Sequence, residues 1–362
     1  MSVTIESVAN ETQKLTLETS KKLSPSLRAL LPTFPKVDSP PLEEVSVVDR
    51  ASNASPEKRA LLDAVSKRID LTTHIGTELH GIQLSQLSDQ QKDELALLIA
   101  ERGVVFFRDQ ELDVHQQLEL GRFYGPLHVH HTTPHPEGLP EVHLIYQDEN
   151  VGVDNSYLPY PASQDYWHSD VSYELQPPSY TSLKIHVQPE VGSDTLWASQ
   201  YAAYDKLSTT YKRFVEGLVA VHSGVEQADD ARRKGTYVRR EPVLHEHPVV
   251  RTHPVTGWKA LYVNPVFTRY IKGVSKRESD SILQFLYSHI TGSSDLQVRF
   301  KWYPNSVAIW DNRVTVHTVA RDSFGSYRHG TRVTPHGEKP YYDAESKSRA
   351  EEFRKKIKQQ TE

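Results

Sequence analysis

The residues best suited to chemistry are a histidine and an aspartate two positions apart, His168 and Asp170. In an extended strand alternate side chains point to the same face, so these two can reach one metal ion while Ser169 points away. A second histidine from distant sequence, His317, would complete a set of two imidazoles and one carboxylate. Such a set, with coordination positions left open, is typical of non-haem Fe(II) oxygenases. The spacing therefore predicts a metal site, although an H-x-D pair alone is weak evidence, because most histidines have other roles.

The composition narrows the classes of partner and of metal ligand. The 362 residues carry a formal net charge of -5, which gives no basic field for nucleic acid. Cysteine is absent, so histidines and carboxylates must do any metal chemistry. No apolar stretch is long enough to span a bilayer, and the first 22 residues lack the pattern of a targeting signal. We expect a cytoplasmic protein that binds neither nucleic acid nor membrane.

The elements that must position the metal ligands are mostly short strands. An apolar run at 104–107 and alternating apolar residues at 181–187 favour strands, and 307–310 reads as another strand that ends shortly before His317. Capping boxes at Ser88 and Ser275 predict helices after them. Many short strands with turns between them, plus a few peripheral helices, predict a mainly β fold of the double-stranded β-helix (jelly roll) type.

The chain divides into three predicted parts. Residues 1–54, rich in serine, proline and charge, are predicted to form an extended, partly ordered N-terminal arm. The alternative, between which the sequence does not decide, is that its apolar residues pack onto the body or onto a second subunit of a possible homo-oligomer. Residues 55–342 form the jelly-roll domain, which starts with a helix at Ser55, and 343–362 form a charged C-terminal helix. Within the domain, 147–165 reads as a long loop ahead of His168, of the kind that often forms a lid, although the sequence does not tell which loop closes over the site. The charged stretch 225–247 reads as a solvated excursion.

From about residue 68 to 342 the chain resembles the taurine dioxygenase family of Fe(II)- and 2-oxoglutarate-dependent oxygenases, and in particular fungal sulfonate dioxygenases. Six motifs in the same order carry the resemblance. They are Val105-Phe106-Phe107-Arg108-Asp109-Gln110, Gly125-Pro126-Leu127-His128-Val129-His130, Trp167-His168-Ser169-Asp170, Gly192-Ser193-Asp194-Thr195-Leu196-Trp197, His247-Pro248-Val249-Val250-Arg251-Thr252-His253-Pro254 and Ile309-Trp310-Asp311-Asn312-Arg313-Val314-Thr315-Val316-His317.

The resemblance implies roles for matched positions. His168, Asp170 and His317 would be the iron ligands and the catalytic centre. Thr195 and Arg328 would hold the cosubstrate 2-oxoglutarate, and O2 would be the oxidant. The residue types agree with this, because a guanidinium pairs with a carboxylate bidentately and keeps its charge at any working pH.

The resemblance also implies a clamp for the substrate anion. In a strand Arg332 would share a face with Arg328, and together with His130 it would hold a sulfonate. From the residues alone, His128 and His130 on one face allow a second metal site, but a hydrogen bond to a ligand is the preferred interpretation. Ion pairing at the surface is the structural alternative for the arginine.

Other matched positions would complete the substrate pocket. Tyr173 and Phe267 would wall it, although as aromatic residues they are equally explicable as core. Gln164 stands where taurine dioxygenase has an asparagine, and Thr133 where it has a tyrosine. The anion-binding end is thus retained and the amine-binding end altered, so the resemblance implies a sulfonate more firmly than taurine itself.

The implied reaction is hydroxylation of the carbon next to sulfur in an alkanesulfonate, which releases sulfite and an aldehyde together with succinate and CO2. The same chemistry on an alkyl sulfate ester, or on an aryloxy or other carboxylate substrate, is an alternative. An alternative of another class is a non-catalytic jelly-roll protein that binds metal or 2-oxoglutarate. A zinc hydrolase fits less well, because no further histidine or glutamate base accompanies the three predicted ligands in the motifs.

Overall fold

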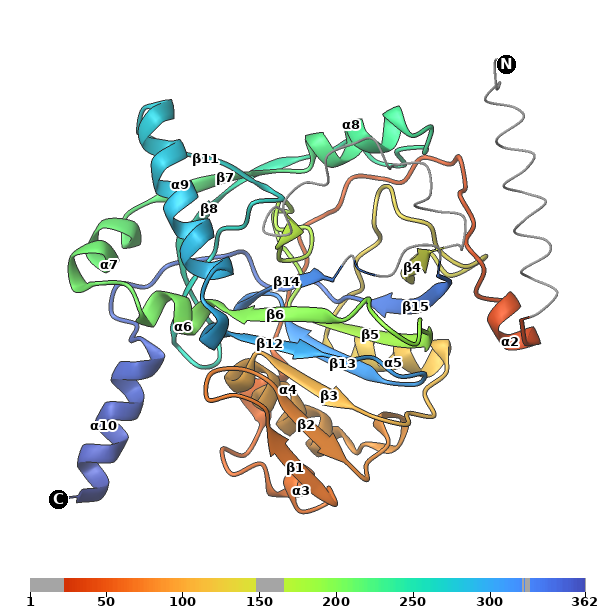
Figure 1. The fold of residues 1–362 in the computed structure, drawn as a ribbon, viewed down its shortest axis with the longest axis horizontal. Helices are drawn as coiled ribbons and strands as arrows, with labels where there is room; N and C mark the ends of the chain where they lie inside the picture. The colour runs from red at the N-terminus through yellow and green to blue at the C-terminus, as the bar shows by residue number, and fades with distance from the viewer. Residues whose placement is uncertain (1–22, 148–165, 321, 323–325, 362) are drawn as a thin grey trace.

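The computed structural model describes residues 23–147, 166–320, 322 and 326–361. Two sheets face each other at its centre (Figure 1). The larger has seven strands, all antiparallel to their neighbours except β2 and β3. In spatial order they are β1 (Lys67–Asp70), β2 (Thr77–His80), β3 (Val104–Phe107), β13 (Val307–Asp311), β5 (Tyr180–Val187), β15 (Arg328–Val333) and β4 (His143–Gln147). The smaller has β12 (Gln297–Phe300), β6 (Thr195–Ser199) and β14 (Thr315–Val319).

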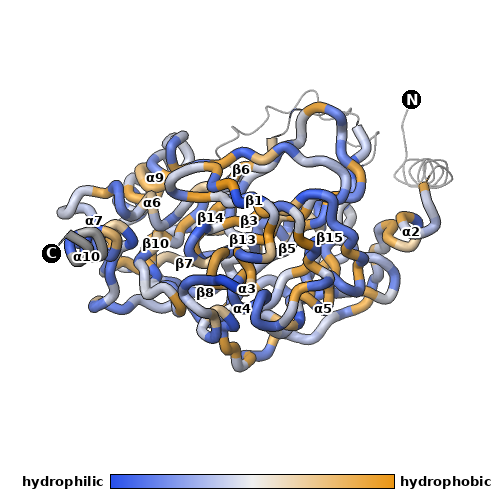
Figure 2. Tube along the Cα trace, turned by 90° about the horizontal axis from the view of Figure 1, so that it is seen from below, coloured by the Kyte–Doolittle hydropathy of each residue, from blue (hydrophilic) through white to orange (hydrophobic). Residues whose placement is uncertain are grey.

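Alternation along β3 explains how the large sheet is buried on both faces. Val104 and Phe106 point toward the small sheet, where the Phe106 ring stacks on Phe300 with centroids 4.1 Å apart. Val105 and Phe107 point the other way, into a core shared with the helix α4 (Asp89–Arg102). A strand with two buried faces reads as a continuous apolar run, which is what residues 104–107 show. In Figure 2 hydrophobic residues gather along these central strands.

Further strands and helices surround the two sheets. The remaining strands are β7 (Val219–Ser223), β8 (Leu244–Pro248), β9 (Val250–Thr252), β10 (Lys259–Leu261) and β11 (Thr268–Ile271). The remaining helices are α2 (Pro25–Arg28), α3 (Arg59–Leu62), α5 (Val114–Tyr124), α6 (Gln200–Asp205), α7 (Thr209–Glu216), α8 (Val225–Arg233), α9 (Lys276–Thr291) and α10 (Arg349–Thr361). Among the described residues, no helix combines the length and the apolar character that crossing a membrane requires.

Two helix predictions are confirmed and two need correction. Ser88 and Ser275 make the predicted capping boxes of α4 and α9. The helix predicted from Ser55 is only the short α3, because Lys58 takes a left-handed backbone conformation with φ of 54° at its start. The C-terminal helix begins at Arg349, and it extends away from the body of the molecule (Figure 1).

Only part of the charged stretch 225–247 is the solvated excursion that the sequence predicts, with Arg232, Arg233 and Lys234 exposed. Arg239 and Arg240 within it are buried. Arg239 donates to the carbonyls of His130 and Thr133 at 2.8 and 2.6 Å, and Arg240 donates to that of Val129 at 3.0 Å. The prediction fails for these two residues because their guanidiniums find acceptors in a loop distant in sequence, which composition cannot reveal. These hydrogen bonds of the two arginines hold the loop 129–133 in place.

A glycine in β15 sets the spacing between β15 and β5, and this yields a stability prediction. A Cβ on Gly330 would lie 2.8 Å from both the Lys184 carbonyl oxygen and the Ile185 Cδ1. We expect Gly330→Ala to lower the free energy of unfolding by roughly 1–3 kcal/mol, the usual cost of overpacking. Gly217→Ala is the matched control, since its Cβ would meet no atom within 4 Å. Urea unfolding measures both, and equal stabilities would contradict the close packing described here.

Candidate metal centre and ligand cavity

The three predicted metal ligands converge because two distant segments pair through their backbones. The N–H of His168 donates to the carbonyl of His317 at 3.0 Å, and the N–H of His317 donates back at 2.8 Å. Asp170 Oδ1 lies 3.7 Å from Nε2 of His168 and 3.8 Å from Nε2 of His317. Ligand atoms of all three lie within 4.8 Å of one another, the only such group of three or more histidines and carboxylates among the described residues. Because two atoms that bind one ion at about 2.1 Å are at most about 4.2 Å apart, little side-chain movement would let them share an ion.

The protonation states of these groups suit metal binding. Nδ1 of His168 lies 2.8 Å from the Tyr166 carbonyl, so it carries the proton and leaves Nε2 free to act as a ligand. Burial, with the nearby His168, lowers the pKa of His317 to about 3 and keeps its imidazole neutral. Burial alone would raise the pKa of Asp170, but the charge of Arg332 and the two histidines outweigh it and lower this pKa to about 2. Neutral imidazoles and an ionised carboxylate are the forms that bind a divalent metal.

Asn312 holds the backbone at Asp170. Its side-chain oxygen accepts from the Asp170 N–H at 3.2 Å and from the Trp310 indole N–H at 2.9 Å. Its amide donates to the Thr181 hydroxyl at 2.6 Å. The next residue, Val171, has a φ of 37°, which is strained for a β-branched side chain. The strained residue directly follows Asp170, one of the predicted metal ligands. Surrounding contacts such as those of Asn312 can hold the backbone in this conformation.

A cavity of about 270 Å³ opens onto the three ligands. It combines charged or polar groups with an apolar wall. Its other described lining residues are His130, His143, Ile145, Val171, Leu183, Thr195, Gln227, Phe267, Trp310, Val319, Arg328 and Arg332. A larger cavity of about 500 Å³ lies between residues 38–44 and the segment 238–245. It is lined by none of the three predicted metal ligands, so it is not the cavity of the metal centre.

Arg328 and Thr195 fit a carboxylate at one end of the cavity. Arg328 Nε donates to Gln188 at 3.1 Å, but its Nη2 is buried without a hydrogen-bond partner in the described part of the chain. Burial lowers the pKa of Arg328 to about 10, so the guanidinium stays charged at neutral pH. The Thr195 hydroxyl accepts from the Trp302 indole at 2.9 Å, which leaves its own proton for a ligand. An anion here would satisfy donors that are costly to bury unpaired.

Arg332 and His130 line the same cavity, and Arg332 contacts one of the predicted metal ligands directly. Arg332 Nη1 donates to Asp170 Oδ1 at 2.6 Å, and Nη2 makes a short hydrogen bond to His143 Nδ1. Nδ1 of His130 accepts from the backbone N–H groups of Thr132 and Thr133 at 3.1 and 3.3 Å. The His130 proton must therefore sit on Nε2, which makes this ring the hydrogen-bond donor that the sequence suggests.

Sequence reasoning missed His143. It lies directly opposite Arg332 in the pairing of β4 with β15, so both side chains line the same cavity. The strand pattern of 143–147 was the one available signal, and it does not specify its partner strand. Gln227 and Asn312 were also missed as contributors, although Asn312 stands within a matched motif.

Of the remaining predicted pocket residues, some line the cavity and others do not. Phe267 lines the cavity, whereas Tyr173 packs edge-on behind it with centroids 5.0 Å apart and donates to Gln227 at 2.8 Å. Tyr173 is thus a supporting residue and not part of the wall. Thr133 contacts His130 through its backbone and does not line the cavity. Gln164 lies outside the described residues, as does the rest of the predicted loop 147–165 apart from Gln147.

Comparisons with known proteins show what the chain is similar to and which of its residues match. The family model described as taurine catabolism dioxygenase TauD, TfdA family matches residues 67–334. A Schizosaccharomyces pombe protein with the provisional name of alpha-ketoglutarate-dependent sulfonate dioxygenase is 45% identical over 332 residues, which cover 90% of this chain and 83% of that protein. An alpha-ketoglutarate-dependent sulfonate dioxygenase of Saccharomyces cerevisiae is 44% identical over 277 residues, 75% of this chain and 67% of that one.

A solved structure gives the same result for the fold. The crystal structure of a taurine dioxygenase from Burkholderia xenovorans superposes with a TM-score of 0.66 at 34% identity, over 77% of this chain and 93% of that chain. The predicted jelly roll is confirmed by this likeness.

Several buried or half-buried histidines away from the metal ligands predict how stability depends on pH. Burial is the main cause that lowers their pKa values, to about 3 or 4. They are His131, His186, His247, His329 and His336. Their folded forms stay neutral below the ordinary pKa of about 6.5, whereas the unfolded chain takes up protons there.

We therefore expect stability to be fully present above pH 6.5 and to fall as the pH drops toward 4. Each such histidine should contribute about 1.4 kcal/mol per pH unit in that window. Urea unfolding between pH 7 and 5 checks this. His186→Gln should reduce the slope by the share of one histidine, and an unchanged slope would show that His186 is not held neutral.

Proposed function

The chain belongs to the taurine catabolism dioxygenase TauD, TfdA family, and from this premise we propose that it is an Fe(II)- and 2-oxoglutarate-dependent oxygenase acting on alkanesulfonates. The observation that carries the proposal is the convergence of His168, Asp170 and His317 beside a cavity that holds two buried arginines. An iron bound by two imidazoles and one carboxylate keeps open positions for other ligands.

His168, Asp170 and His317 are the proposed iron ligands. When bound, Fe(II) supplies the oxidation of a substrate C–H bond by O2, coupled to decarboxylation of 2-oxoglutarate to succinate and CO2. Arg328 is proposed to pair with the distal carboxylate of 2-oxoglutarate through its unpartnered Nη2, and Thr195 to donate its hydroxyl proton to the same group. These two residues fix the direction in which the cosubstrate lies.

Arg332 and His130 are proposed to hold the sulfonate. Both can donate toward the cavity, and Phe267 covers it with an apolar face. Their task is positioning, because holding the anion selects which C–H bond reacts. Hydroxylation of the carbon that bears sulfur gives an adduct whose C–S bond breaks, which yields an aldehyde and sulfite. A small organic anion is thus the expected partner, while cytoplasmic location and a possible homo-oligomer stay predictions from the sequence.

Assays with several classes of substrate test the proposal against its alternatives. With Fe(II), 2-oxoglutarate and O2, we expect succinate and sulfite from alkanesulfonates. Sulfate released from alkyl sulfates, or a phenol released from aryloxyacetates, would favour the same chemistry on another anion. Binding of 2-oxoglutarate and metal without any succinate, even uncoupled, would favour a non-catalytic binding protein.

Arg332→Ala should separate binding of the substrate from binding of the cosubstrate. We expect kcat/KM for the sulfonate to fall at least about 100-fold, because charge-assisted hydrogen bonds to the anion are lost. Uncoupled succinate formation should persist, because a bound Fe(II) would replace the charge of Arg332 beside the Asp170 carboxylate, and the Asp170 N–H keeps its contact with Asn312. Loss of 2-oxoglutarate binding in this variant would contradict the assignment of Arg332 to the sulfonate.

Arg328→Ala should have the complementary effect. We expect KM for 2-oxoglutarate to rise about 10- to 100-fold, as for a lost hydrogen bond between charged groups. Gln188→Ala is the matched control, because it removes the neighbour that Arg328 Nε contacts and leaves the guanidinium itself. If the two variants raise this KM equally, Arg328 does not bind the cosubstrate directly.

A further inference from the structure

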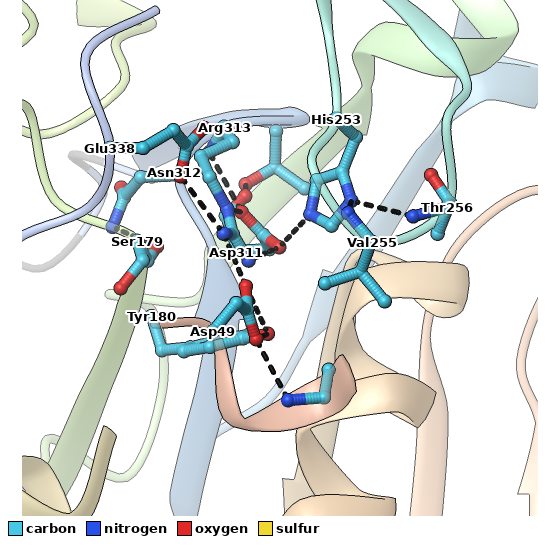
Figure 3. Close-up of polar contacts among 12 residues, drawn as sticks. Asp49, Ser179, Tyr180, His253, Val255, Thr256, Asp311, Asn312, Arg313 and Glu338 are labelled. Carbon is cyan, nitrogen blue, oxygen red and sulfur yellow. Dashed lines mark hydrogen bonds and ion pairs between the residues drawn. The ribbon is translucent and has the colours of Figure 1, made fainter. Parts of the chain in front are cut away.

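A buried cluster of charged residues lies on the turn between β13 and β14, which leads to His317. Its centre is Arg313, whose side chain is 1% exposed. Arg313 donates to both carboxylate oxygens of Asp311 at 2.8 and 2.7 Å and to Glu338 at 3.3 Å. It also donates to Asp49 Oδ2 at 2.5 Å. Figure 3 shows these side chains pointing toward one another.

Asp49 reaches this cluster from outside the region that the family model matches, residues 67–334. Its Oδ1 accepts from the Ala51 N–H at 2.8 Å and from the Tyr180 hydroxyl at 2.9 Å. Its Oδ2 accepts from Arg313. Both oxygens therefore receive N–H donors, so the amide of an asparagine would have to place a donor against a donor. Only a carboxylate fits this position.

The cluster is ionised at neutral pH. Burial opposes ionisation of Asp49, but the guanidinium of Arg313 outweighs it and lowers the pKa of Asp49 below its usual value. Nε2 of His253 donates to Asp311 at 3.0 Å, while its Nδ1 accepts from the N–H groups of Val255 and Thr256, which leaves this histidine neutral. Removing a partner would leave Arg313 buried and less well paired, which is costly.

The same turn carries the group that holds Asp170. Asp311 and Arg313 belong to the charged cluster, and Asn312 between them accepts from the Asp170 N–H at 3.2 Å. Thr315, at the start of β14, donates to the Asp311 carbonyl at 2.7 Å, and its own carbonyl accepts from Ser169 at 2.7 Å. The turn therefore links the charged cluster to the backbone N–H of Asp170 and to the side chain of the preceding residue, Ser169.

We propose that Asp49 is a positioning residue for the metal centre, through which the N-terminal arm fixes the turn of Arg313 and Asn312. The inference rests on the proposed role of His168, Asp170 and His317 as metal ligands. Contacts that orient metal ligands typically alter affinity about 10- to 100-fold when removed. The arm thus belongs to the structural support of the site, although none of its described residues, from 23 onward, lines the cavity.

The test is anaerobic titration of the full chain with Co(II), followed by its visible absorption bands. We expect Asp49→Asn to raise the Kd for Co(II) about tenfold or more and to change the bands at saturation. Asp38→Asn is the matched control, because it removes another arm carboxylate, which accepts from the Tyr237 hydroxyl at 2.6 Å on an exposed surface. Leu286→Ala, a core truncation in α9, controls for lost stability alone. Both controls should keep the Kd within about twofold.

The outcomes separate the two proposals. If the wild-type chain binds no Co(II), the proposed metal centre is refuted and this inference with it. If the wild type binds and folded Asp49→Asn matches it in Kd and spectrum, the inference alone is overturned. Should Asp49→Asn fail to fold, Tyr180→Phe decides, since it removes only one donor to Asp49. Weaker Co(II) binding by Tyr180→Phe than by Asp38→Asn supports the proposal, and a Kd equal to that of the wild type overturns it.

Discussion

Backbone pairing between His168 and His317 is the constraint on which the proposed metal centre depends. A site built from two distant segments needs something other than the metal to bring them together, because loop closure is paid in chain entropy before any ligand binds. Here two backbone hydrogen bonds align the histidines, and β14 is in turn paired with β6 in the small sheet. The sheets therefore place two of the ligands, and only Asp170 relies on side-chain contacts for its position.

That third ligand explains the polar groups buried around it. The turn after His168 leaves the strand and passes through the strained conformation of Val171, so no ladder of backbone bonds holds it. Asn312 and Ser169 replace the ladder with side-chain hydrogen bonds to backbone groups. Both side chains are buried. At such a position a polar group without a hydrogen bond is costly, whereas a hydrogen bond that is formed makes the local structure rigid. Rigidity at Asp170 is what a metal site with open positions requires.

Features with a local cause could be predicted from the sequence, and features with a tertiary cause could not. The capping boxes of α4 and α9 and the buried strand β3 follow from local patterns. The spacing of His168 and Asp170 predicts that they share an ion, and the two do lie side by side, but at a turn and not within a regular strand. The roles of Arg328 and Arg332 came from the resemblance, and their placement on one strand agrees with it. His143 and the buried Arg239 and Arg240 were missed, because their partners come from strands and loops that only the fold brings near. Whether the arm packs onto the body was left open by the sequence, and the contacts of Asp49 with Arg313 and Tyr180 show that this part of it does.

The charges of the cavity bear on which anions it suits. Fe(II) and the guanidiniums of Arg328 and Arg332 exceed the one carboxylate among the described lining residues, Asp170, by three positive charges. One 2-oxoglutarate and one sulfonate together carry three negative charges, so the proposed loaded cavity is balanced. Balance matters here because an uncompensated charge in a buried site is expensive. A zwitterion such as taurine adds an ammonium group, for which the described lining offers no further carboxylate, whereas a simple alkanesulfonate needs none.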